Sequence, residues 1–572
     1  MTDDLGELLA WVESPHAANA VRTLEDSAAR AKRWAAATYG KLAADVRLLA
    51  AGLRAHRLAP GDRVCVLCAP GPAFIGALYA AWWAGGCGVP LPLPVMSEPP
   101  ARYWSRIESM IAVARPRLIM VSAAQLADPQ GAPLAGLARA AGADVVTLAA
   151  LCAAGHDGPL GRVRGTGTAL VQFTSGSGGP PKGVPVSAAN LSANVAALRR
   201  WLGITETDRT ATWLPHYHDM GLTGCVLVPV TAQGDIFVMR PEQFIRDPVA
   251  WLSCFGEHGA TMTASPSFGY QYAAARTHPE RLRGMDFAPW RVAVVGAERV
   301  SPRAIAGFAG LLAPFRFDAG AFRPAYGLAE ATLAVTGRHP EDCFTALDVD
   351  WEAAERGRKV PVTAEHQLTA FGREGSRPWV VSCGRPLAGV DVTIVDDDHR
   401  ELPEGTLGEV AVSGASVTRG YLGAEPESVF TSFVGARLFT GDDGFIWNGQ
   451  LYVVGRRGDG LKVAGRSLYS EQVEAEFAVA AGLSPSRCTA LLGTLGGTEE
   501  AAVIVEAPVG EWVAAASAVL TRLTGGIRHA VYTAPRGTVP RTTSGKPMRK
   551  AAWKLLAAGD LNITCVQRKD RE

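Results

Sequence analysis

A glycine-rich stretch, FTSGSGGPPKG at residues 173–183, combines the residue types that bind phosphate. Glycines let backbone N–H groups approach an anion closely, and Lys182 adds a mobile positive charge near the hydroxyl of Thr174. The nucleotide-binding loop of ATPases needs the order Gly-Lys-Ser/Thr, whereas this chain has Pro181-Lys182-Gly183, so that loop is excluded. The stretch indicates an anion site, although considered alone its composition is also typical of a solvated turn.

Six further segments carry charged, aromatic or glycine residues in fixed patterns. They are WLPHYHDMGL at 213–222, VVGAERV at 294–300, PAYGLAEAT at 324–332, LFTGDDG at 438–444, YVVGRRGD at 452–459 and VPRTTSGKPMRK at 539–550. In order and approximate spacing, all seven segments resemble the core motifs of the adenylate-forming superfamily of acyl-CoA synthetases, peptide-synthetase adenylation domains and luciferases. The phrases WLPHYHDMGL, YGLAEAT, VVSCGRP and GRSLYSEQVE resemble its fatty acyl-AMP ligase branch. The resemblance covers residues 25 to 555.

The resemblance implies a reaction in which a carboxylate attacks the α-phosphorus of ATP, giving an acyl-adenylate and pyrophosphate. This reaction needs no protein nucleophile, but it needs donors and positive charge around a phosphorus whose oxygens gain negative charge. The implied cofactors are ATP and Mg²⁺, and the implied catalytic residues are Lys546, Glu330 and Thr174. Glu330 and Thr174 are expected to hold Mg²⁺, which prefers oxygen ligands.

The resemblance also implies how ATP is held. Asp442 is expected to accept hydrogen bonds from both ribose hydroxyls, Tyr326 to stack on adenine, and Arg456 to support the ribose and phosphates. Lys546 is expected to reach in from a small domain and bridge the carboxylate and the ATP oxygens. The implied ATP-binding set is Thr174, Ser175, Gly176, Ser177, Lys182, Gly296, Ala297, Glu298, Tyr326, Gly327, Asp442 and Arg456.

Each of these residues has a structural alternative when it is considered alone. An isolated glutamate or lysine is more often a solvated surface charge, and an isolated tyrosine is more often part of a core. The Asp-Gly pair in TGDDG ordinarily favours a hairpin turn. The functional interpretation therefore depends on the joint occurrence of the motifs.

The acyl pocket is expected to use segments 213–222 and 263–270. His216 and His218 lie two residues apart, but no further ligands cluster nearby, so the pair is a weak metal signal. Ser265 is expected to narrow the acyl tunnel and favour a shorter or aromatic acid. The implied pocket residues are His216, His218, Asp219, Met220, Gly221, Ser265, Ser267 and Phe268.

Two glycines depart from the family pattern. Gly178 replaces the threonine of the usual SGSTG loop, which removes one hydroxyl donor from the pyrophosphate site. Gly458 stands in the GRxxD hinge, where Asp or Lys is usual. Because glycine lowers torsional barriers, we expect the domain after the hinge to move more freely than in relatives.

About fifty residues separate PAYGLAEAT from SCGRP, and the segment at about 340–380 resembles the insertion of fatty acyl-AMP ligases. That insertion implies transfer of the acyl group to the phosphopantetheine thiol of an acyl carrier protein instead of free CoA. A surface excursion without effect on the reaction remains an alternative. Two other functions stay open. One is an aryl- or medium-chain acyl-CoA ligase, or an adenylate donor to another nucleophile. The other is a degenerate family member that binds an acyl-adenylate or a carrier protein without catalysis.

Composition excludes several partners. The chain has 572 residues, 48% of them apolar and 19% charged, and 56 basic residues against 55 acidic ones leave a net charge of +1. This balance predicts no nucleic acid partner. The acidic N-terminus is unlike a secretory signal, and prolines and glycines interrupt the charge-free stretch 64–97, so we expect a cytoplasmic protein without a membrane span. Cys65 and Cys68 are expected to be buried strand thiols, with metal or redox use as the alternative.

The elements that must position these residues follow an α/β rhythm. Short β-branched runs alternate with Ala/Leu-rich helical stretches, which predicts mostly parallel αβ-layered subdomains. Closely spaced strands at about 388–456 predict a β-rich subdomain, and a helix over 470–480, N-capped by Ser470, opens a small mobile α+β domain. We expect a large N-terminal domain over 1–456 and a C-terminal lid over 457–572, with a hinge near 458–459, as in the acyl-CoA synthetase/luciferase-like fold.

Overall fold

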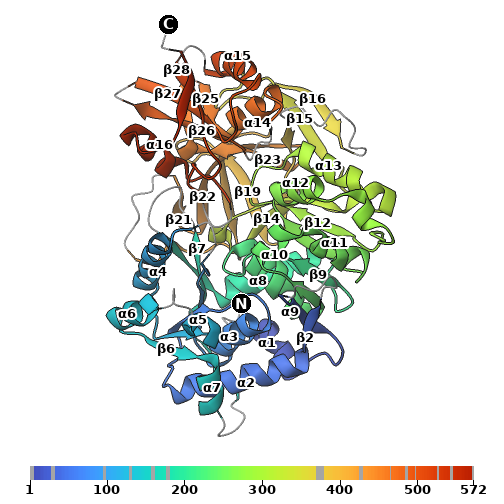
Figure 1. Ribbon diagram of the computed structural model, residues 1–572, viewed down its shortest axis with the longest axis vertical. Helices are drawn as coiled ribbons and strands as arrows, with labels where there is room; N and C mark the ends of the chain where they lie inside the picture. Colours follow the sequence, from blue (N-terminus) through green and yellow to red (C-terminus); the bar gives the residue numbers. More distant parts are fainter. Residues whose placement is uncertain are drawn as a thin grey trace.

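A computed structural model describes residues 5–26, 33–94, 98–127, 132–155, 161–165, 167–174, 181–368, 379–423, 430–463, 466–483, 487–495, 498–524, 527–541 and 545–569. In Figure 1 the N-terminal elements form the lower part of the molecule, and the elements after residue 456, in orange and red, form the upper part. The described strands form six sheets, of which two α/β sheets and one antiparallel sheet position the site.

The first α/β sheet has six strands in the order β6-β5-β3-β4-β7-β8, and all neighbours are parallel except β7 and β8. Its inner strands are continuously apolar because helices cover both faces of a parallel sheet. The strands are β3 Arg63–Leu67, β4 Cys87–Pro90, β5 Leu118–Val121, β6 Asp144–Thr147, β7 Thr168–Thr174 and β8 Lys182–Ser187. The helices are α2 Tyr39–Ala55, α3 Pro72–Trp83, α4 Pro100–Ala114, α5 Ala123–Ala127, α6 Ala132–Ala140 and α7 Leu148–Ala154.

The second α/β sheet has nine strands in the order β18-β14-β13-β12-β11-β9-β10-β1-β2, parallel from β13 to β1. Its strands are β1 Ala20–Leu24, β2 Trp34–Thr38, β9 Arg209–Thr212, β10 Asp235–Val238, β11 Met262–Ser265, β12 Val292–Val295, β13 Phe322–Gly327, β14 Ala334–Gly337 and β18 Arg385–Pro386. Its helices are α1 Gly6–Glu13, α8 Ala188–Leu202, α9 Val228–Ala232, α10 Pro241–Arg246, α11 Pro248–Gly256, α12 Ser267–Arg276 and α13 Pro302–Leu312. Short π and 3₁₀ turns complete it at η2 Met220–Leu227, η3 Pro279–Leu282, η4 Ala313–Phe315, η5 Ala319–Ala321 and η6 Ala329–Ala331.

Helix α8 connects the two α/β sheets. It begins in a capping box in which the Ser187 side chain accepts from the Asn190 amide and Asn190 accepts from the Ser187 amide. The helix then packs on β7 and β8 of one sheet and β14 of the other. Its apolar residues recur every three to four positions, so one face of the helix lies over both cores.

The antiparallel sheet follows the predicted β-rich region. It contains β19 Val390–Val395, β20 Gly408–Gly414, β21 Ser432–Val434, β22 Arg437–Trp447 and β23 Gln450–Arg456. The predicted insertion forms a smaller sheet from β15 Thr345–Val349, β16 Val362–Gln367 and β17 Val380–Val381, while residues 369–378 lie outside the described part of the chain.

The C-terminal elements begin at η8 Arg457–Asp459. They comprise the hairpin β24 Gly460–Val463 and β25 Arg466–Tyr469, and a sheet of β26 Cys488–Leu495, β27 Thr498–Val505, β28 Arg528–Thr533 and β29 Thr564–Lys569. The helices are α14 Ser470–Ala480, α15 Trp512–Thr524 and α16 Arg549–Ala558. The predicted α/β class, with parallel layers, a β-rich part and a final α+β part, is confirmed, whereas the domain boundaries and the mobility stay predictions.

One local expectation is wrong. Ser470 is the first residue of α14 and not its N-cap, because its hydroxyl donates instead to the Asp459 carbonyl at 2.7 Å. The hairpin turn that was the structural alternative for TGDDG is absent. Asp442 and Asp443 lie inside the long strand β22, after Gly441, whose positive φ of 74° accommodates an irregularity in the pairing with β20.

Thiols and charges are distributed as the composition suggests. All ten cysteines are unbonded: Cys65 and Cys68 are buried, as predicted, and Cys343 and Cys565 are exposed. Burial raises the pKa of the Cys68 thiol to about 12.

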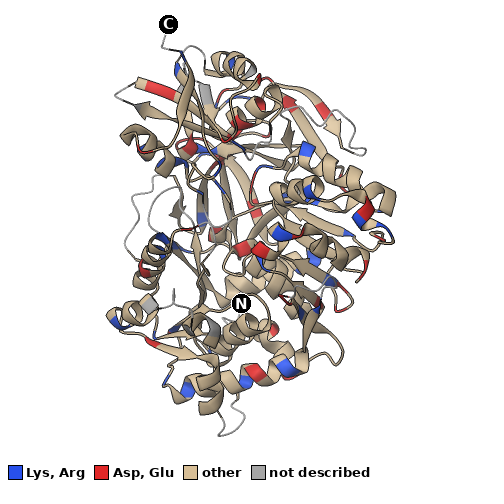
Figure 2. Cartoon of the chain, viewed as in Figure 1, with Lys and Arg blue, Asp and Glu red and all other residues tan. Residues whose placement is uncertain are grey.

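Basic and acidic residues are interspersed over the chain (Figure 2). No helix among the described residues is long and apolar enough to cross a membrane.

Candidate active site

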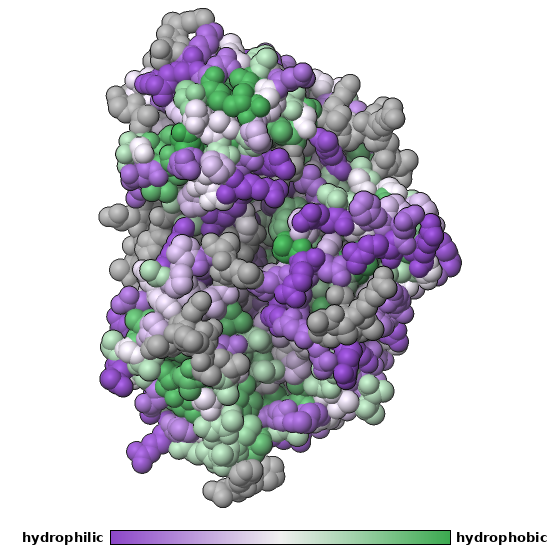
Figure 3. Space-filling view, viewed as in Figure 1, coloured by the Kyte–Doolittle hydropathy of each residue, from purple (hydrophilic) through white to green (hydrophobic). Residues whose placement is uncertain are grey.

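A cavity of about 760 Å³ lies where the two α/β sheets, the antiparallel sheet and the C-terminal elements meet. Figure 3 shows a hollow near the middle of one face of the molecule, with hydrophilic residues around it. The cavity wall contains most of the residues that the motifs single out. These are Thr174, Lys182, His218, Asp219, Met220, Ser267, Phe268, Gly296, Ala297, Glu298, Tyr326, Gly327, Glu330, Asp442, Arg456 and Lys546.

Strand ends bring these residues together. Thr174 ends β7, Gly296 directly follows β12, and Tyr326 lies at the end of β13, so three parallel strands present their carboxyl ends to the cavity. Ligands of open α/β sheets bind at this edge. Lys182 begins β8 and is the cross-strand partner of Thr174, which places the lysine and the hydroxyl on neighbouring backbone positions.

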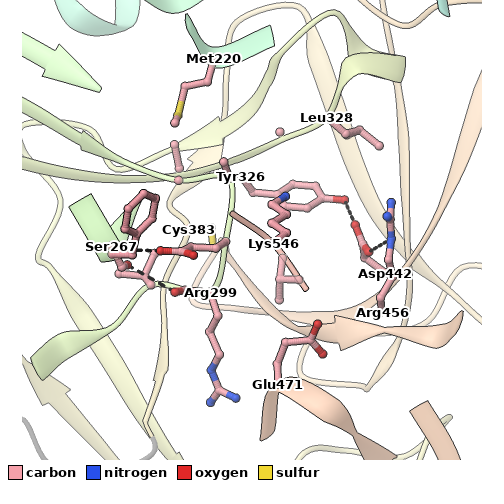
Figure 4. Close-up of a pocket in the computed structure, with 18 of the residues that line it drawn as sticks. Met220, Ser267, Arg299, Tyr326, Leu328, Cys383, Asp442, Arg456, Glu471 and Lys546 are labelled. Carbon is pink, nitrogen blue, oxygen red and sulfur yellow. Dashed lines mark hydrogen bonds and ion pairs between the residues drawn. The ribbon is translucent and has the colours of Figure 1, made fainter. Parts of the chain in front are cut away.

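A hydrogen-bonded triad forms one side of the site (Figure 4). The Tyr326 hydroxyl donates to Asp442 Oδ2 at 2.7 Å, and Arg456 Nε donates to Asp442 Oδ1 at 3.1 Å. Asp442 and Arg456 are cross-strand partners on β22 and β23, so the antiparallel register positions the ion pair. Asp442 raises the pKa of Arg456, which keeps this guanidinium charged. The triad is a preorganised set of acceptors and donors beside the cavity.

Tyr421 contacts both Glu330 and Lys182, the carboxylate through its hydroxyl and the ammonium through the face of its ring. The carboxylate is 5% exposed, and its Oε1 accepts from the Tyr421 hydroxyl at 2.7 Å. Lys182 Nζ lies 4.8 Å from the centre of the Tyr421 ring, a cation–π distance. Tyr421 thus spaces an anionic and a cationic group. Sequence reasoning missed this tyrosine because RGYLG carries no charge pattern and its partner Glu330 is 91 residues away.

Lys546 enters the cavity from the segment before α16 and lies among charged groups that come from earlier segments of the chain, between residues 219 and 456 (Figure 4). Burial lowers the pKa of Lys546, and Arg456 lowers it further, while Asp219 and Glu298 oppose both effects. The Lys546 side chain is exposed to the open cavity although protein groups surround it, so its ammonium can neutralise additional negative charge that enters the cavity.

The loop after β12 has an unusual backbone. Ala297 adopts φ of 65°, a left-handed conformation that is uncommon for residues other than glycine. This turn directs Glu298 back to helix α12, where its Oε1 accepts from the Phe268 amide at 2.7 Å. The Glu298 side chain is exposed to the cavity, and partial desolvation by the surrounding protein raises its pKa. Gly296 and Ala297 line the cavity together with Tyr326, where a planar base can contact them.

The HYHDM segment contributes His218, Asp219 and Met220 to the cavity wall. His218 Nδ1 lies 2.7 Å from Asp219 Oδ1, and the same oxygen accepts from the Met220 amide at 2.8 Å. Although burial alone would raise the pKa of Asp219, His218 and these hydrogen bonds lower it. Met220 then begins the π-helix η2, a rare element that is frequent at functional sites.

Three predicted pocket residues do not line the cavity. His216 is buried behind it, edge-on to Phe74, and burial lowers its pKa to about 3. Ser265 is fully buried and its hydroxyl donates to the Pro266 carbonyl at 3.0 Å, so it does not narrow the pocket. Gly221 faces the backbone of Pro215, 2.2 Å from where a Cβ would lie. Ser175, Gly176, Ser177 and Gly178 lie outside the described residues.

Oxygen donors at the cavity fit a magnesium ion. Among the described residues no cluster of three or more His, Cys, Asp or Glu side chains could hold a metal ion by itself. Glu330 and Thr174 supply a carboxylate and a hydroxyl at the cavity, and these oxygen donors fit Mg²⁺, which is usually bound by one or two carboxylates together with substrate phosphates.

Comparisons with known proteins agree with this geometry. Residues 16–422 match the model of a family described as AMP-binding enzyme. A 4-hydroxyphenylalkanoate adenylyltransferase of Mycobacterium tuberculosis is 32% identical over 531 residues, covering 86% of this chain and 82% of that protein. A medium-chain-fatty-acid–[acyl-carrier-protein] ligase, JamA of Moorena producens, is 29% identical over 552 residues, covering 92% and 90%. A solved structure from a study of fatty acyl-adenylate ligases of E. coli and L. pneumophila superposes with a TM-score of 0.83 at 26% identity, covering 97% and 98%.

Proposed function

Because this chain belongs to the AMP-binding enzymes, in the fatty acyl-AMP ligase branch of the adenylate-forming superfamily, we propose that it passes its activated acyl group to an acyl carrier protein. The chain is an adenylate-forming enzyme: it joins a carboxylic acid to AMP. Transfer to the phosphopantetheine thiol of a carrier is the finer step that we add. It is supported by the carrier-protein specificity in the name of the JamA relative and by the attachment of the insertion described below.

In the proposed reaction, Asp442 holds the ribose hydroxyls, and the Tyr326 ring and the Gly296–Ala297 wall hold the adenine. Arg456 orients Asp442, since its Nε donates to one carboxylate oxygen. Thr174 and Lys182 contact the phosphates that leave as pyrophosphate. These groups position the α-phosphorus for attack by the substrate carboxylate, and positioning with charge neutralisation is the main contribution of proteins to such transfers.

Lys546 bridges the acid carboxylate and the α-phosphate oxygens in this proposal. The observation that carries the proposed function is that Lys546, from the C-terminal part, lines the same cavity as Asp442, Glu330 and Thr174. Charge develops on the phosphoryl oxygens during attack, and an ammonium that the protein already holds at the cavity stabilises it. Glu330 and Thr174 would hold Mg²⁺ when nucleotide is bound, and the ion would supply charge neutralisation for the phosphates.

The insertion is attached to the hinge by ion pairs. Arg356 of the insertion donates from Nε to Asp443 Oδ1 at 2.9 Å and also pairs with Asp397. Asp397 pairs in turn with Arg457 of η8 at 2.8 Å, directly before Gly458. Because Asp443 is adjacent to Asp442 on β22, these pairs connect the insertion both to the proposed ribose site and to the start of the C-terminal part.

A shared core strengthens this attachment. Leu347 and Val380 of the insertion pack in one cluster with Phe445 of the antiparallel sheet and with Tyr469 of the C-terminal part. The Tyr469 hydroxyl donates to Asp443 Oδ2 at 2.7 Å. We infer that the insertion restrains the C-terminal part from the arrangement that accepts free CoA, so a carrier-borne thiol becomes the acceptor.

The test is an acceptor assay on the purified full-length protein. Mg-ATP and a mixed panel of aliphatic and aryl acids are incubated alone, with CoA, or with a phosphopantetheinylated acyl carrier protein, and products are identified by mass spectrometry. The expected result is acyl-AMP in every reaction, acyl-carrier thioester with the carrier, and no acyl-CoA. Acyl-CoA formed as fast as acyl-AMP would make the protein a CoA ligase and remove the proposed role of the insertion.

A further inference from the structure

An apolar arm leaves the catalytic part of the cavity and enters the space between helix α8 and the nine-stranded sheet. Ala264 of β11 and Val294 of β12 are register partners, so their side chains lie next to each other on one face of the sheet. Leu198 and Trp201 of α8 line the arm from the opposite side. Met262 also lines it, two residues before Ala264 and therefore on the same face of β11.

Strand register gives the direction and depth of this arm. Met262 pairs with Val292, and Gly296, which lies at the catalytic end, is four residues farther along β12. At about 3.3 Å per residue the two levels are roughly 13 Å apart, a distance that about ten carbon–carbon bonds of an extended acyl tail span. Arg291, just before β12, donates to the Leu202 carbonyl at 2.7 Å, so the C-terminal end of α8 lies beside the deep end of the arm.

Two further residues limit the arm. Trp201 is held rigidly, because its indole Nε1 donates to the Arg338 carbonyl at 3.0 Å and its ring lies against Gly337, 2.1 Å from where a Cβ would be. Gly224 of η2 lines the arm from a third side, and a Cβ there would point at Leu333, 3.4 Å away, without meeting backbone. A side chain at position 224 would therefore occupy space in the arm while leaving the helix undistorted.

From these contacts we propose that Met262 ends the acyl pocket and Gly224 keeps it open, so that the enzyme selects an apolar acid with a straight tail of about eight to twelve carbons, set by the four-residue depth between Gly296 and Met262. This inference rests on the proposed function, in which the acid carboxylate lies beside Lys546 at the level of Gly296. A longer tail has to displace Met262, which is 1% exposed and packed in the core.

The experiment measures acyl-AMP formation by the full-length protein with Mg-ATP and single saturated acids from four to eighteen carbons, and with phenylalkanoic acids of equal length. We expect the rate to be highest between eight and twelve carbons and to fall about tenfold or more by sixteen carbons. Each methylene that does not fit the apolar pocket lowers the rate with that acid. Comparison of aryl and aliphatic acids of equal length shows whether the arm accepts an aromatic or an aliphatic tail.

Two variants locate the limit. M262A should move the optimum to longer acids and raise the ratio of the sixteen-carbon rate to the ten-carbon rate about tenfold. G224L should move the optimum to shorter acids, and it tests the arm independently if M262A fails to fold. M285A is the matched control, because Met285 is a partly buried methionine that packs outside the cavity.

The outcomes separate this inference from the proposed function. Equal rates for ten- and eighteen-carbon acids, or an optimum that neither M262A nor G224L moves, would overturn the assignment of Met262 and Gly224 while adenylation stands. Absence of acyl-AMP with every acid, although ATP binds, would overturn the proposed function together with the inference.

Discussion

At the scale of single residues, the site depends on a lysine whose side chain is exposed to the cavity. The charge of Arg456 lowers the pKa of Lys546, and the charges of Asp219 and Glu298 raise it. The benefit of this ammonium appears when further negative charge arrives in the cavity. This makes Lys546 the residue whose loss separates catalysis from folding most clearly.

We predict that Lys546→Ala lowers the rate of acyl-AMP formation by about 10²- to 10³-fold, the range measured for loss of one preorganised electrostatic group. The unfolding midpoint should stay nearly unchanged, since the Lys546 side chain is exposed to the cavity and exposed ion pairs contribute little to stability. Pyrophosphate release and thermal unfolding measure the two effects. Lys554→Ala, at an exposed lysine on helix α16, which follows the Lys546 segment, is the charge-matched control. A variant that retains full activity would remove Lys546 from the proposed reaction.

Adenylation activity should depend on pH through the protonation of Lys546. Since burial lowers the pKa of Lys546 below its ordinary value, the protonated form is present below that lowered pKa and is lost as pH rises through it. Adenylation should therefore decline on the alkaline side of its pH profile. In Lys546→Arg the residual activity should lack this decline, because arginine stays charged, and an identical alkaline limb in both proteins would contradict the assignment.

His216 should make the protein sensitive to acid. Neither of its ring nitrogens has a hydrogen-bond partner among the described residues, and burial lowers its pKa to about 3. The unfolded chain binds a proton at its ordinary pKa, so between about pH 6.5 and 3 this histidine lowers the free energy of unfolding by about 1.4 kcal/mol per pH unit.

His216→Phe should remove that slope, because phenylalanine fills a similar space beside Phe74 and carries no polar atom. Urea unfolding at pH 7, 6 and 5 measures the effect. As pH falls, the free energy of unfolding should fall more steeply in the wild type than in the variant, by a slope that corresponds to about one more proton bound on unfolding. Parallel pH dependences in the two proteins would show that His216 does not titrate on unfolding.

The sequence could identify these residues but not their orientation. Asp442, Glu330 and Lys546 could be predicted because each belongs to a motif with several fixed neighbours. Ser265 could not, because one position along a strand reverses the side chain: Ala264 faces the cavity and Ser265 faces away. Choosing between them requires the register of β11, which depends on its partners in the sheet.

At the scale of elements, the hinge glycine has a packing role. A Cβ on Gly458 would lie 2.9 Å from the Phe430 ring, and Lys550 of α16 lies 5.3 Å from the centre of the same ring. Gly458 does not have a positive φ, so its backbone would accept other residues. The sequence predicted freedom of movement at this glycine, whereas the structure adds a close contact between η8, Phe430 and α16.

We predict that Gly458→Ala destabilises this arrangement by about 1–3 kcal/mol, the usual cost of an added group in a filled site, and slows adenylation. Phe430→Ala should suppress the effect, because the ring that meets the new methyl group is then absent. A double-mutant cycle on thermal unfolding and acyl-AMP formation measures the coupling. Additive effects of the two substitutions would mean that Gly458 matters for backbone freedom alone.

At the scale of the whole molecule, the choice of acceptor depends on contacts between parts that are distant in sequence. Arg356, Asp397 and Arg457 join the insertion to the hinge, and Tyr469 joins the C-terminal part to Asp443. None of these contacts follows from local patterns, because the partners are 26 to 60 residues apart. The order of the motifs could predict the fold, but which ion pairs close the insertion onto the hinge depends on the tertiary arrangement.

We predict that Arg356→Gln loosens this connection and lets free CoA accept the acyl group, so that acyl-CoA formation rises at least about tenfold while acyl-AMP formation stays within about twofold. The side chain of Asp443 is 3% exposed, and loss of its arginine leaves a buried carboxylate without its main counter-charge. Product analysis by mass spectrometry with CoA measures the change.

Arg358→Ala is the control for this prediction. Arg358 lies in the same insertion and is 74% exposed, and its ion pair with Glu355 is local. Acyl-CoA from both variants would indicate a general effect of charge removal, and acyl-CoA from neither would leave the insertion without the proposed restraining role.

The two exposed cysteines allow the movement of the C-terminal part to be measured in the unmodified sequence. The exposed cysteines, Cys343 within the insertion and Cys565 on β29, lie in the two parts whose relative movement the proposed transfer step requires. Burial of most other thiols slows their alkylation, because it raises their pKa values and limits access. A donor and an acceptor fluorophore can therefore be attached without any substitution, and their energy transfer would follow the C-terminal part as ATP, acid and carrier protein bind in turn.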